Sequence, residues 1–305
     1  MKTLTWQKPG QQNVAQELIK IIINYVAELR ISKISMDRIF LCSFGNSSYL
    51  SSLSRLRAQA EETGWFYRVE CSTEKNLSAF FRQEAADLLK QEVRGFGYWI
   101  WKPQILLQCL QQMEYGDILL YTDAGCHINE VGKNMFLAYI KEVKKHPSGF
   151  LVFGARKGSL ERQYTKGDIF SYFGIQEDDD IYNSGQIHAT TFFLRKDDHT
   201  QKVVECWKKV MMENRNLIDD SPSSTPNALD FKENRHDQSV FSILMKLNKA
   251  QIYPITHIWS YTWFFMGYYP IWAKRDRGET LRKYYPLKQY WKDFLFFVRN
   301  RVERL

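Results

Sequence analysis

The sequence predicts an α/β fold in which a mixed, mostly parallel sheet is flanked by helices. The chain has 305 residues, of which 44% are hydrophobic and 25% are charged, so it can bury the core of one large soluble domain. Near its start, a short apolar run, a Ser-rich loop, a helical pattern and a second apolar run follow one another. This order is typical of the opening of a parallel sheet with crossover helices.

The first elements are indicated by the spacing of apolar residues. Residues 12–30 carry apolar side chains at helical intervals, and residues 38–44 form a short apolar run that predicts a strand. Ser47 or Ser48 can cap the helix that follows. Residues 65–71 then predict a second strand. These elements form the strand–helix–strand unit that indicates the fold class.

The middle of the chain continues the alternation of strands and helices. Residues 76–93 predict a helix, and Pro103 is expected in the first turn of another helix that runs to Gln112. A third strand is expected to end at Asp123. The later elements are expected as strands at 149–156 and 186–196, a helix at 199–214, a long ordered loop at 218–234, a helix from 236 and a last strand at 251–257.

Cysteine usage and hydropathy narrow the class of protein. The five cysteines contain no CxxC pair, which favours neither a zinc site nor a disulfide framework and fits a reducing cytoplasm. The first twelve residues lack the apolar core of a signal peptide. No segment reaches the roughly 20 apolar residues of a membrane span. We therefore expect a cytoplasmic protein.

One acidic residue stands where an apolar strand is expected to end. Asp123 follows the run Ile-Leu-Leu-Tyr-Thr and is itself followed by Ala124 and Gly125. Ligands of open α/β sheets bind beyond the carboxyl ends of the strands. A carboxylate at this point can hold a divalent cation that in turn holds a diphosphate, and the small neighbours leave room for a ligand. A simple turn-forming aspartate is the alternative.

Three further stretches carry polar or aromatic residues that a simple connector does not need. In residues 94–106, Arg94 or Lys102 can meet phosphate charge. In residues 182–196, Asn183 and Gly185 open a strand with a polar, permissive backbone that can bind sugar hydroxyls or form a turn. The aromatic residues of the first stretch can stack on a base or sugar, or can be core: Phe96, Tyr98, Trp99 and Trp101.

The third stretch is the start of the helix predicted from residue 236. His236, Asp237 and Gln238 stand where the apolar helical pattern begins. An acid in this position gains from the helix dipole and from capping free N–H groups, which explains Asp237 as a structural residue. A carboxylate and an amide at a helix start can also position or deprotonate a sugar hydroxyl.

Taken in order, these motifs resemble a known family. The set GYWIWKP, DILLYTDAG, NSGQ with FFLRK, and RHDQSVFS resembles bacterial glycosyltransferases of the GT-A fold that act on lipopolysaccharide, capsule or other surface glycans. The resemblance covers roughly residues 36–260. The layout is more distantly similar to the glycogenin-like enzymes, in which an apolar strand ends in Asp-x-Asp.

The resemblance implies a nucleotide-sugar donor, such as a UDP- or GDP-sugar, and a metal. In the family pattern the strand-end aspartates bind Mn²⁺ or Mg²⁺ and the donor diphosphate, and Asp123 matches the first of them. Gly125 replaces the second, which is a departure from the pattern. His257, after the last expected strand, is the candidate for a further metal ligand, with a buried structural histidine as the alternative.

The resemblance also implies roles for the other candidates. Asp237 is the expected base of an inverting reaction, whereas in a retaining reaction Asp237 and Gln238 would orient donor and acceptor; the glycogenin-like layout leans toward retention. Lys166 and Asp168 are expected near the donor or acceptor sugar, or in a solvated loop. The nucleotide base and ribose are expected at Ser43, Gly45 and Asn46.

The basic charge is concentrated at the C-terminal end. The net charge is +8, and residues 268–305 contribute +6 of it from ten Lys/Arg and four Asp/Glu interleaved with ten aromatic residues. This composition suits a helix on an anionic membrane, and equally a packed helix with a solvated basic face. We expect an N-terminal helix at 1–35, a catalytic domain at 36–267 and a basic aromatic appendage at 268–305.

Two other functional classes are weighed against the transferase. A nucleic-acid-binding protein would explain the pI of about 9.1, but the charge is confined to the tail and no nucleic-acid motif is found. A non-catalytic nucleotide-sugar or glycan-binding protein would explain the missing second aspartate. We expect a glycosyltransferase that acts on an oligosaccharide or lipid-linked glycan, at the inner face of the membrane.

Overall fold

The computed structural model describes residues 38–155, 158–276 and 287–302. The chain divides into two units, Met1–Arg38 and Ile39–Leu305, and the fold described below is that of the second unit. The helix predicted over residues 12–30 lies outside the described residues. The described part of the appendage at 268–305 comprises residues 268–276 and 287–302.

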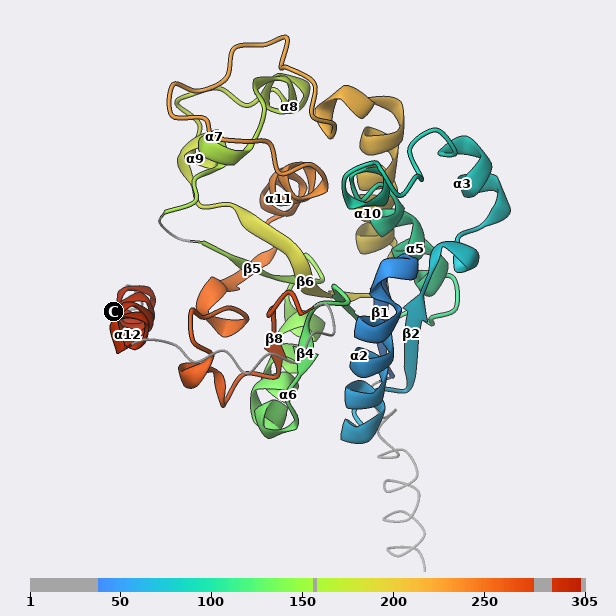
Figure 1. Cartoon of the computed structure of the whole chain (residues 1–305), viewed down its shortest axis with the longest axis vertical. Coiled ribbons are helices and arrows are strands. Elements are labelled where there is room, and N and C mark those ends of the chain that lie inside the picture. The colour runs from blue at the N-terminus through green and yellow to red at the C-terminus, as the bar shows by residue number, and fades with distance from the viewer. Residues whose placement is uncertain (1–37, 156–157, 277–286, 303–305) are drawn as a thin grey trace, which may run out of the picture. The chain divides into compact units, whose positions relative to one another are not determined.

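A six-stranded sheet lies at the centre of the second unit (Figure 1). Neighbouring strands pair in the order β2-β1-β3-β6-β5-β7, and only β6 runs antiparallel to its neighbours. The predicted mixed, mostly parallel sheet is therefore confirmed. The strands are β1 (Ile39–Phe44), β2 (Arg68–Ser72), β3 (Ile118–Thr122), β5 (Phe150–Gly154), β6 (Ile187–Arg195) and β7 (Gln251–Pro254).

The central strands are apolar on both faces because helices cover both faces. Successive residues of β3 point to opposite cores: Leu119 and Tyr121 enter one, whereas Ile118 and Leu120 enter the other. The first core includes side chains of α5 (Trp101–Leu110), α10 (Asp198–Glu213) and α11 (Asp237–Leu247). The second includes side chains of α2 (Leu50–Thr63) and α6 (Lys133–Lys145).

Several helix ends differ from their predicted form. Ser47 and Ser48 lie in a 3₁₀ turn, Ser47–Tyr49, and neither supplies a side-chain cap to α2. The helix predicted over 76–93 is helical only in α3 (Ala79–Glu84), where Ser78 caps the first turn. The prediction was too long because apolar residues at helical spacing continue into a series of turns. The other short helices are α4 (Gly95–Tyr98), α7 (Glu161–Tyr164), α8 (Gly167–Phe173) and α9 (Asp180–Asn183).

A second, two-stranded sheet lies beside the first. It pairs β4 (His127–Ile128) antiparallel with β8 (Ile271–Trp272), which are far apart in the sequence. The segment after β8, residues 273–276, returns to the end of β3, where Asp276 N donates a hydrogen bond to Gly125 O (3.0 Å). Ser52 Oγ donates to Asp276 O at 2.9 Å. Neither the β4–β8 pair nor the contacts of Asp276 with Gly125 and Ser52 were predicted from the sequence.

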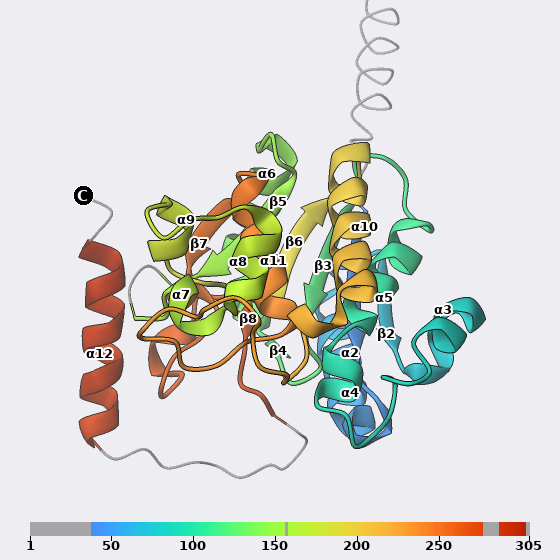
Figure 2. The same cartoon turned by 90° about the horizontal axis from the view of Figure 1, so that it is seen from above.

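The C-terminal helix α12 (Leu287–Val302) lies on the far side of the unit from α3 (Figures 1 and 2). Its Asp293 is fully buried and accepts hydrogen bonds from Ser260 Oγ (2.6 Å to Oδ2) and from the N–H of Tyr261 (3.0 Å). These bonds fix one face of α12 on the loop after β7. Within the described ranges, we find no helix that is both long enough and apolar enough for a membrane span.

Candidate active site

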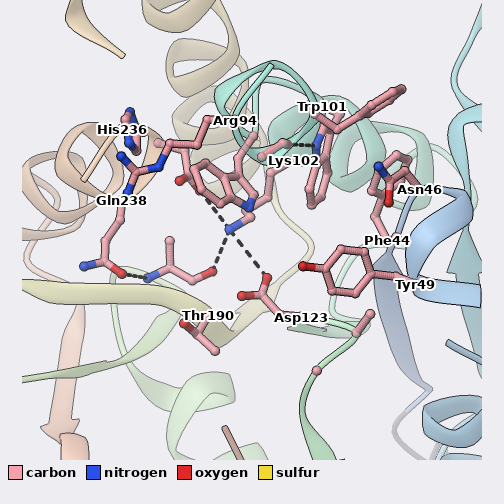
Figure 3. Close-up of a pocket in the computed structure, with 18 of the residues that line it drawn as sticks. Phe44, Asn46, Tyr49, Arg94, Trp101, Lys102, Asp123, Thr190, His236 and Gln238 are labelled. Carbon is pink, nitrogen blue, oxygen red and sulfur yellow. Dashed lines mark hydrogen bonds and ion pairs between the residues drawn. The ribbon is translucent and has the colours of Figure 1, made fainter. Parts of the chain in front are cut away.

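A cavity of about 760 Å³ opens where β1 and β3 end (Figure 3). Its walls come from five places in the sequence: the residues at the end of β1, those after β3, the segment 91–102, the start of α11 and the 273–276 segment. The middle of β6 contributes Ala189 and Thr190 to its floor. The cavity therefore lies at the sheet edge where the strand-end rule predicts a ligand.

Three charged side chains meet at the floor of this cavity. Lys102 Nζ lies 2.8 Å from Asp237 Oδ2 and 3.6 Å from Asp123 Oδ1, and it donates a hydrogen bond to Ala189 O at 3.1 Å. Figure 3 shows the ammonium group between these partners. Lys102 is only 2% exposed. We call Asp123, Lys102 and Asp237 the charged triad.

The charged triad changes the acidity of its members. Burial lowers the pKa of Lys102, but the attraction of Asp123 and Asp237 outweighs it, and the pKa lies above its usual range. Burial raises the pKa of Asp237 to about 6, with the Asp123 charge adding to the rise and Lys102 opposing it. Burial and the Asp123 charge together outweigh the attraction of the Lys102 ammonium, so the Asp237 carboxyl changes its protonation state near pH 6.

The segment that carries Lys102 is tightly folded. Residues 95–99 all have positive φ, including the non-glycine residues Phe96, Tyr98 and Trp99. A Cβ atom on Gly95 would lie 2.5 Å from the Trp99 ring, so this position requires glycine. Trp101 Nε1 donates to Gly95 O at 3.0 Å, and the Trp101 ring stacks on Phe44 at 4.0 Å. Strain of this kind is typical of ligand sites.

The start of α11 supplies a second strained residue. His236 has φ 53°, and its Nδ1 donates to Ile218 O at 2.7 Å. Its Nε2 is buried, without a hydrogen-bond partner among the described residues, 3.7 Å from Asp220. Gln238 Oε1 accepts from Ala189 N at 3.4 Å (Figure 3). The strain turns the chain so that Asp237 and Gln238 face the cavity.

The structure brings together most of the residues predicted for the site. Ser43 is instead fully buried in β1, and Tyr98 packs on His236 with ring centroids 5.3 Å apart. Neither is among the residues that line the cavity. The predicted residues that line it are Gly45, Asn46, Arg94, Trp101, Lys102, Asp123, Ala124, Gly125, Asp237 and Gln238.

Two predicted groups lie elsewhere. Asn183 accepts from Arg162 Nη1 at 2.7 Å and donates to Glu177 O at 2.8 Å, and neither it nor Gly185 lines the cavity. His257 is buried with its Nδ1 2.7 Å from Tyr139 Oη, and it too is absent from the cavity wall. Its position after the last long strand suggested a site residue, but the chain turns it into the core beside aromatic rings.

The residues at the site do not fit the expected Mn²⁺ or Mg²⁺. Within residues 38–155, 158–276 and 287–302, no three His, Cys, Asp or Glu side chains gather in a way that could hold a metal ion. Asp123 and Asp237 already share the Lys102 ammonium. A Cβ atom at Gly125 would lie 3.0 Å from Arg275 Cα, so backbone crowds the position at which the family pattern has its second aspartate.

Some residues of the cavity were not predicted from the sequence. Arg235 and Arg275 both line it. Arg235 places its guanidinium 3.7 Å from the centre of the Tyr164 ring. The run of polar residues at 235–238 was a signal for Arg235, whereas no local pattern marks Arg275. The pairing of β8 with β4 and the contacts of Asp276 with Gly125 and Ser52 bring the 273–276 segment to the cavity.

A second cavity of about 280 Å³ adjoins the first under the loop at 218–234. The two cavities share Arg94, Glu233 and Asn234 as lining residues. Asn234 Oδ1 is buried and has no hydrogen-bond partner among the described residues. The second cavity is otherwise lined by Lys166, Asp219, Asp220, Ser221, Pro222, Ser223, Asn227 and Phe231.

Lys166 and Asp168 hold the loop over this second cavity. Lys166 Nζ donates to Asn216 O at 2.7 Å and lies 3.0 Å from Asp219 Oδ1. Asp168 accepts from Ser224 Oγ and Thr225 N, both at 2.7 Å. Burial works to raise the pKa of Asp168, but these hydrogen bonds lower it to about 2. The loop is therefore pinned at several points.

Together, the sheet and the charged triad define an α/β protein with a charged cavity beyond the ends of parallel strands. No protein-family model and no curated protein sequence matches the chain. Three of the solved structures that are similar to the chain have identities of 10–11% and TM-scores below 0.5, values too low to assign a function.

The first similar structure is a glycosyltransferase involved in the glycosylation of the major capsid of PBCV-1 (10% identity, TM-score 0.43, covering 86% of this chain and 99% of that chain). The second is mouse xyloside xylosyltransferase 1 (11% identity, TM-score 0.42, covering 82% of this chain and 100% of that chain). The third is 4-diphosphocytidyl-2C-methyl-D-erythritol synthase from Anaerococcus prevotii (11% identity, TM-score 0.36, covering 73% of this chain and 89% of that chain).

Proposed function

We propose that the protein is a glycosyltransferase that moves a sugar from a nucleotide-sugar donor to a hydroxyl of a glycan acceptor. The observation that carries the proposal is the charged triad at the floor of a 760 Å³ cavity beyond the ends of β1 and β3. Such a cavity is large enough for a nucleotide sugar. Its floor is acidic and its rim carries arginines, which suits a ligand with hydroxyls at one end and phosphates in the middle.

The cavity offers a place for each part of the donor. The end of β1, with Asn46, Tyr49 and the Trp101 ring, is suited to the base and ribose. Arg94, Arg235 and Arg275 are suited to the diphosphate. Asp237 and Gln238 then lie at the sugar, where a carboxylate and an amide can orient hydroxyl groups.

The reaction needs only these groups. The acceptor oxygen attacks the anomeric carbon, the bond from that carbon to the diphosphate oxygen breaks, and the hydroxyl proton leaves. With inversion, the ionised carboxylate of Asp237 accepts this proton, which its pKa of about 6 permits at neutral pH. With retention, Asp237 and Gln238 orient donor and acceptor. A pH–rate profile with a limb near pH 6 that Asp237→Asn abolishes would indicate inversion.

We place the acceptor in the second cavity. It adjoins the donor cavity through Arg94, Glu233 and Asn234 and is lined by carboxylates, hydroxyls and amides, with Phe231 as an aromatic surface. The unpartnered Asn234 Oδ1 can accept a hydrogen bond from a sugar hydroxyl. A sugar bound there would present a hydroxyl toward the donor.

A lipid-linked or surface glycan is the acceptor class that α12 favours. Trp291 and Leu287 are 62% and 88% exposed, and with Phe294 and Val298 they form an apolar stripe. The buried Asp293 lies on the opposite side of the helix. Exposed Lys288 and Lys292 flank the stripe. We propose that α12 rests on an anionic membrane, and we expect Trp291→Ser to reduce co-sedimentation with phosphatidylserine vesicles.

The decisive experiment is a screen of UDP- and GDP-sugars for hydrolysis and for transfer to glycan acceptors. We expect one donor to turn over and Asp237→Asn to reduce turnover by about 100-fold or more. Arg57→Gln, on the exposed side of α2 and outside the cavity, is the matched control. If donors bind but none turns over, the non-catalytic binding alternative replaces the transferase. Turnover that survives both Asp123→Ala and Asp237→Ala would contradict the site.

A further inference from the structure

We propose that the cavity neutralises the donor diphosphate with cationic side chains of the chain itself, centred on Arg275, in place of a divalent cation. The inference rests on the proposed function and adds to it the way in which the phosphates are bound. It departs from the metal that the sequence resemblance implies. Four features of the described residues support it.

The first feature is that the acids are already paired with a cation. Asp123 and Asp237 share the Lys102 ammonium at 3.6 and 2.8 Å, and Tyr121 Oη donates to Asp123 Oδ1 at 2.6 Å. A divalent ion between these acids would have to displace a lysine that is 2% exposed and bonded to Ala189 O. Displacing a buried charge from its partners is costly.

The second feature is the space beside Gly125. A Cβ atom there would lie 3.0 Å from Arg275 Cα and 3.3 Å from Asp276 N. The backbone of the 273–276 segment therefore crowds the space that any side chain at position 125 would enter, the second strand-end carboxylate included. The same residue that crowds this space adds a positive side chain to the cavity wall. A negative group is thus replaced by a positive one.

The third feature is that the 273–276 segment is firmly held. Asp276 lies 3.2 Å from Arg55 Nη1 and 2.9 Å from His127 Nε2. Ser52 Oγ donates to Asp276 O, and Asp276 N donates to Gly125 O. These contacts fix the backbone beside Arg275, whose own side chain is exposed. An anchored backbone with an exposed cation is suited to binding an anion from solution.

The fourth feature is that the cations of the wall repel one another. Burial lowers the pKa of Arg235, and the charge of Arg275 contributes to the lowering. Arg94 also lines the cavity, and its guanidinium lies 3.4 Å from the half-exposed Asp220. Guanidinium groups recognise phosphate oxygens through paired hydrogen bonds. A diphosphate between them would relieve the repulsion between Arg235 and Arg275.

Inorganic pyrophosphate and Mn²⁺ are the probes that test this inference on the full chain. Titration calorimetry in EDTA buffer should show pyrophosphate binding, and Mn²⁺ in place of EDTA should change the affinity by less than about threefold. Arg275→Gln should weaken binding by at least about tenfold. Arg275→Lys should recover part of this loss, and Arg57→Gln should have no effect. Thermal unfolding of each variant would show that the fold is intact.

The results that would overturn the inference are distinct from those that would overturn the proposed function. Pyrophosphate binding that requires Mn²⁺ and is lost in Asp123→Asn would show a metal site and refute the inference. Absence of binding in both buffers would also refute it, because the cationic wall would then hold no diphosphate. If pyrophosphate binds in EDTA but no nucleotide sugar binds, the proposed function fails, and only the metal-free diphosphate site on the cationic wall stands.

Discussion

Lys102 and Lys246 each place a largely covered ammonium group against carboxylate groups, with side chains that are 3% and 7% exposed. Lys246 Nζ lies 2.6 Å from Glu161 Oε1 and 2.7 Å from Ser184 Oγ, and Glu161 is fully buried. Neither Lys246 nor Glu161 lines the two cavities described above. Lys102, by contrast, faces both Asp123 and Asp237 and opens onto the larger cavity.

The two lysines differ in the balance of their charges. Burial lowers the pKa of Lys246, and the attraction of Glu161 does not make up for it. The pKa of Lys102 is raised because two carboxylates attract its ammonium. A pair with one cation and one anion is complete and joins α7 to α11. A cluster with one cation and two anions carries a net negative charge if both acids are ionised. This makes it the better candidate for a catalytic site.

The largest expected effect separates the two lysines. Lys102→Met and Lys246→Met should each lower the free energy of unfolding by about 3–5 kcal/mol, because each leaves a buried carboxylate without its cation. Only Lys102→Met should also reduce donor turnover per folded molecule, by about 100-fold or more. Denaturant unfolding and donor hydrolysis on the same samples would measure both. Equal losses of turnover in the two variants would remove the distinction.

Asp237 and Glu161, the acid partners of the two lysines, should also differ in their effects on donor turnover and on stability. Asp237→Asn should reduce turnover by about 100-fold and should not lower the free energy of unfolding at neutral pH, because Asp123 still balances Lys102 and the amide avoids the cost of a buried ionised carboxyl. Glu161→Gln should instead lower the free energy of unfolding by about 3 kcal/mol with turnover unchanged. A stable Glu161→Gln variant would show that its lysine needs no partner.

Asp237 should also make the free energy of unfolding depend on pH. The pKa of Asp237 is about 6 in the folded protein and about 4 when unfolded. The folded state therefore binds more protons between these values, and its stability falls as pH rises from about 4 to 6, by about 3 kcal/mol in total, then levels off. Urea titrations across this range should show the contribution, and Asp237→Asn should remove it. A contribution of the opposite sign would contradict the raised pKa.

The smallest expected effect concerns Ser184. Its hydroxyl is bonded to Lys246 and lies outside both cavities. Ser184→Ala should lower the free energy of unfolding by about 1 kcal/mol, the value of one hydrogen bond, and leave donor binding unchanged. Chemical unfolding and calorimetry would check this. A change in donor affinity would indicate that the Glu161 region communicates with the cavity.

The charged triad was predictable because each member stands next to a strong local pattern. Asp123 follows an apolar strand, Lys102 precedes a proline in a helix start, and Asp237 begins an amphipathic helix. Their mutual contact was not predictable from spacing, since Lys102 and Asp237 are brought together only by the sheet and the helices that pack on it. The α/β class was predicted for the same reason, from apolar runs that alternate with helical spacing.

The residues that prediction missed are those placed by distant contacts. Arg275 reaches the cavity through a two-residue strand pair, which is too short to give a pattern. His257 was expected as a metal ligand because the resemblance implies a C-terminal histidine, but a short helical turn, Ile255–His257, directs it to Tyr139. Local sequence therefore predicted the floor of the cavity and not the wall opposite Gly125.

The bond between Ser52 and Asp276 also bears on how the cavity forms during synthesis. It joins residues 224 positions apart, and the pairing of His127 with Asp276 spans 149 positions. Contacts between such distant residues form late and slow the folding of a chain. A nascent chain on the ribosome can complete the strands that carry Asp123 long before Arg275 has been translated. The cavity wall is thus among the last parts of the protein to be assembled.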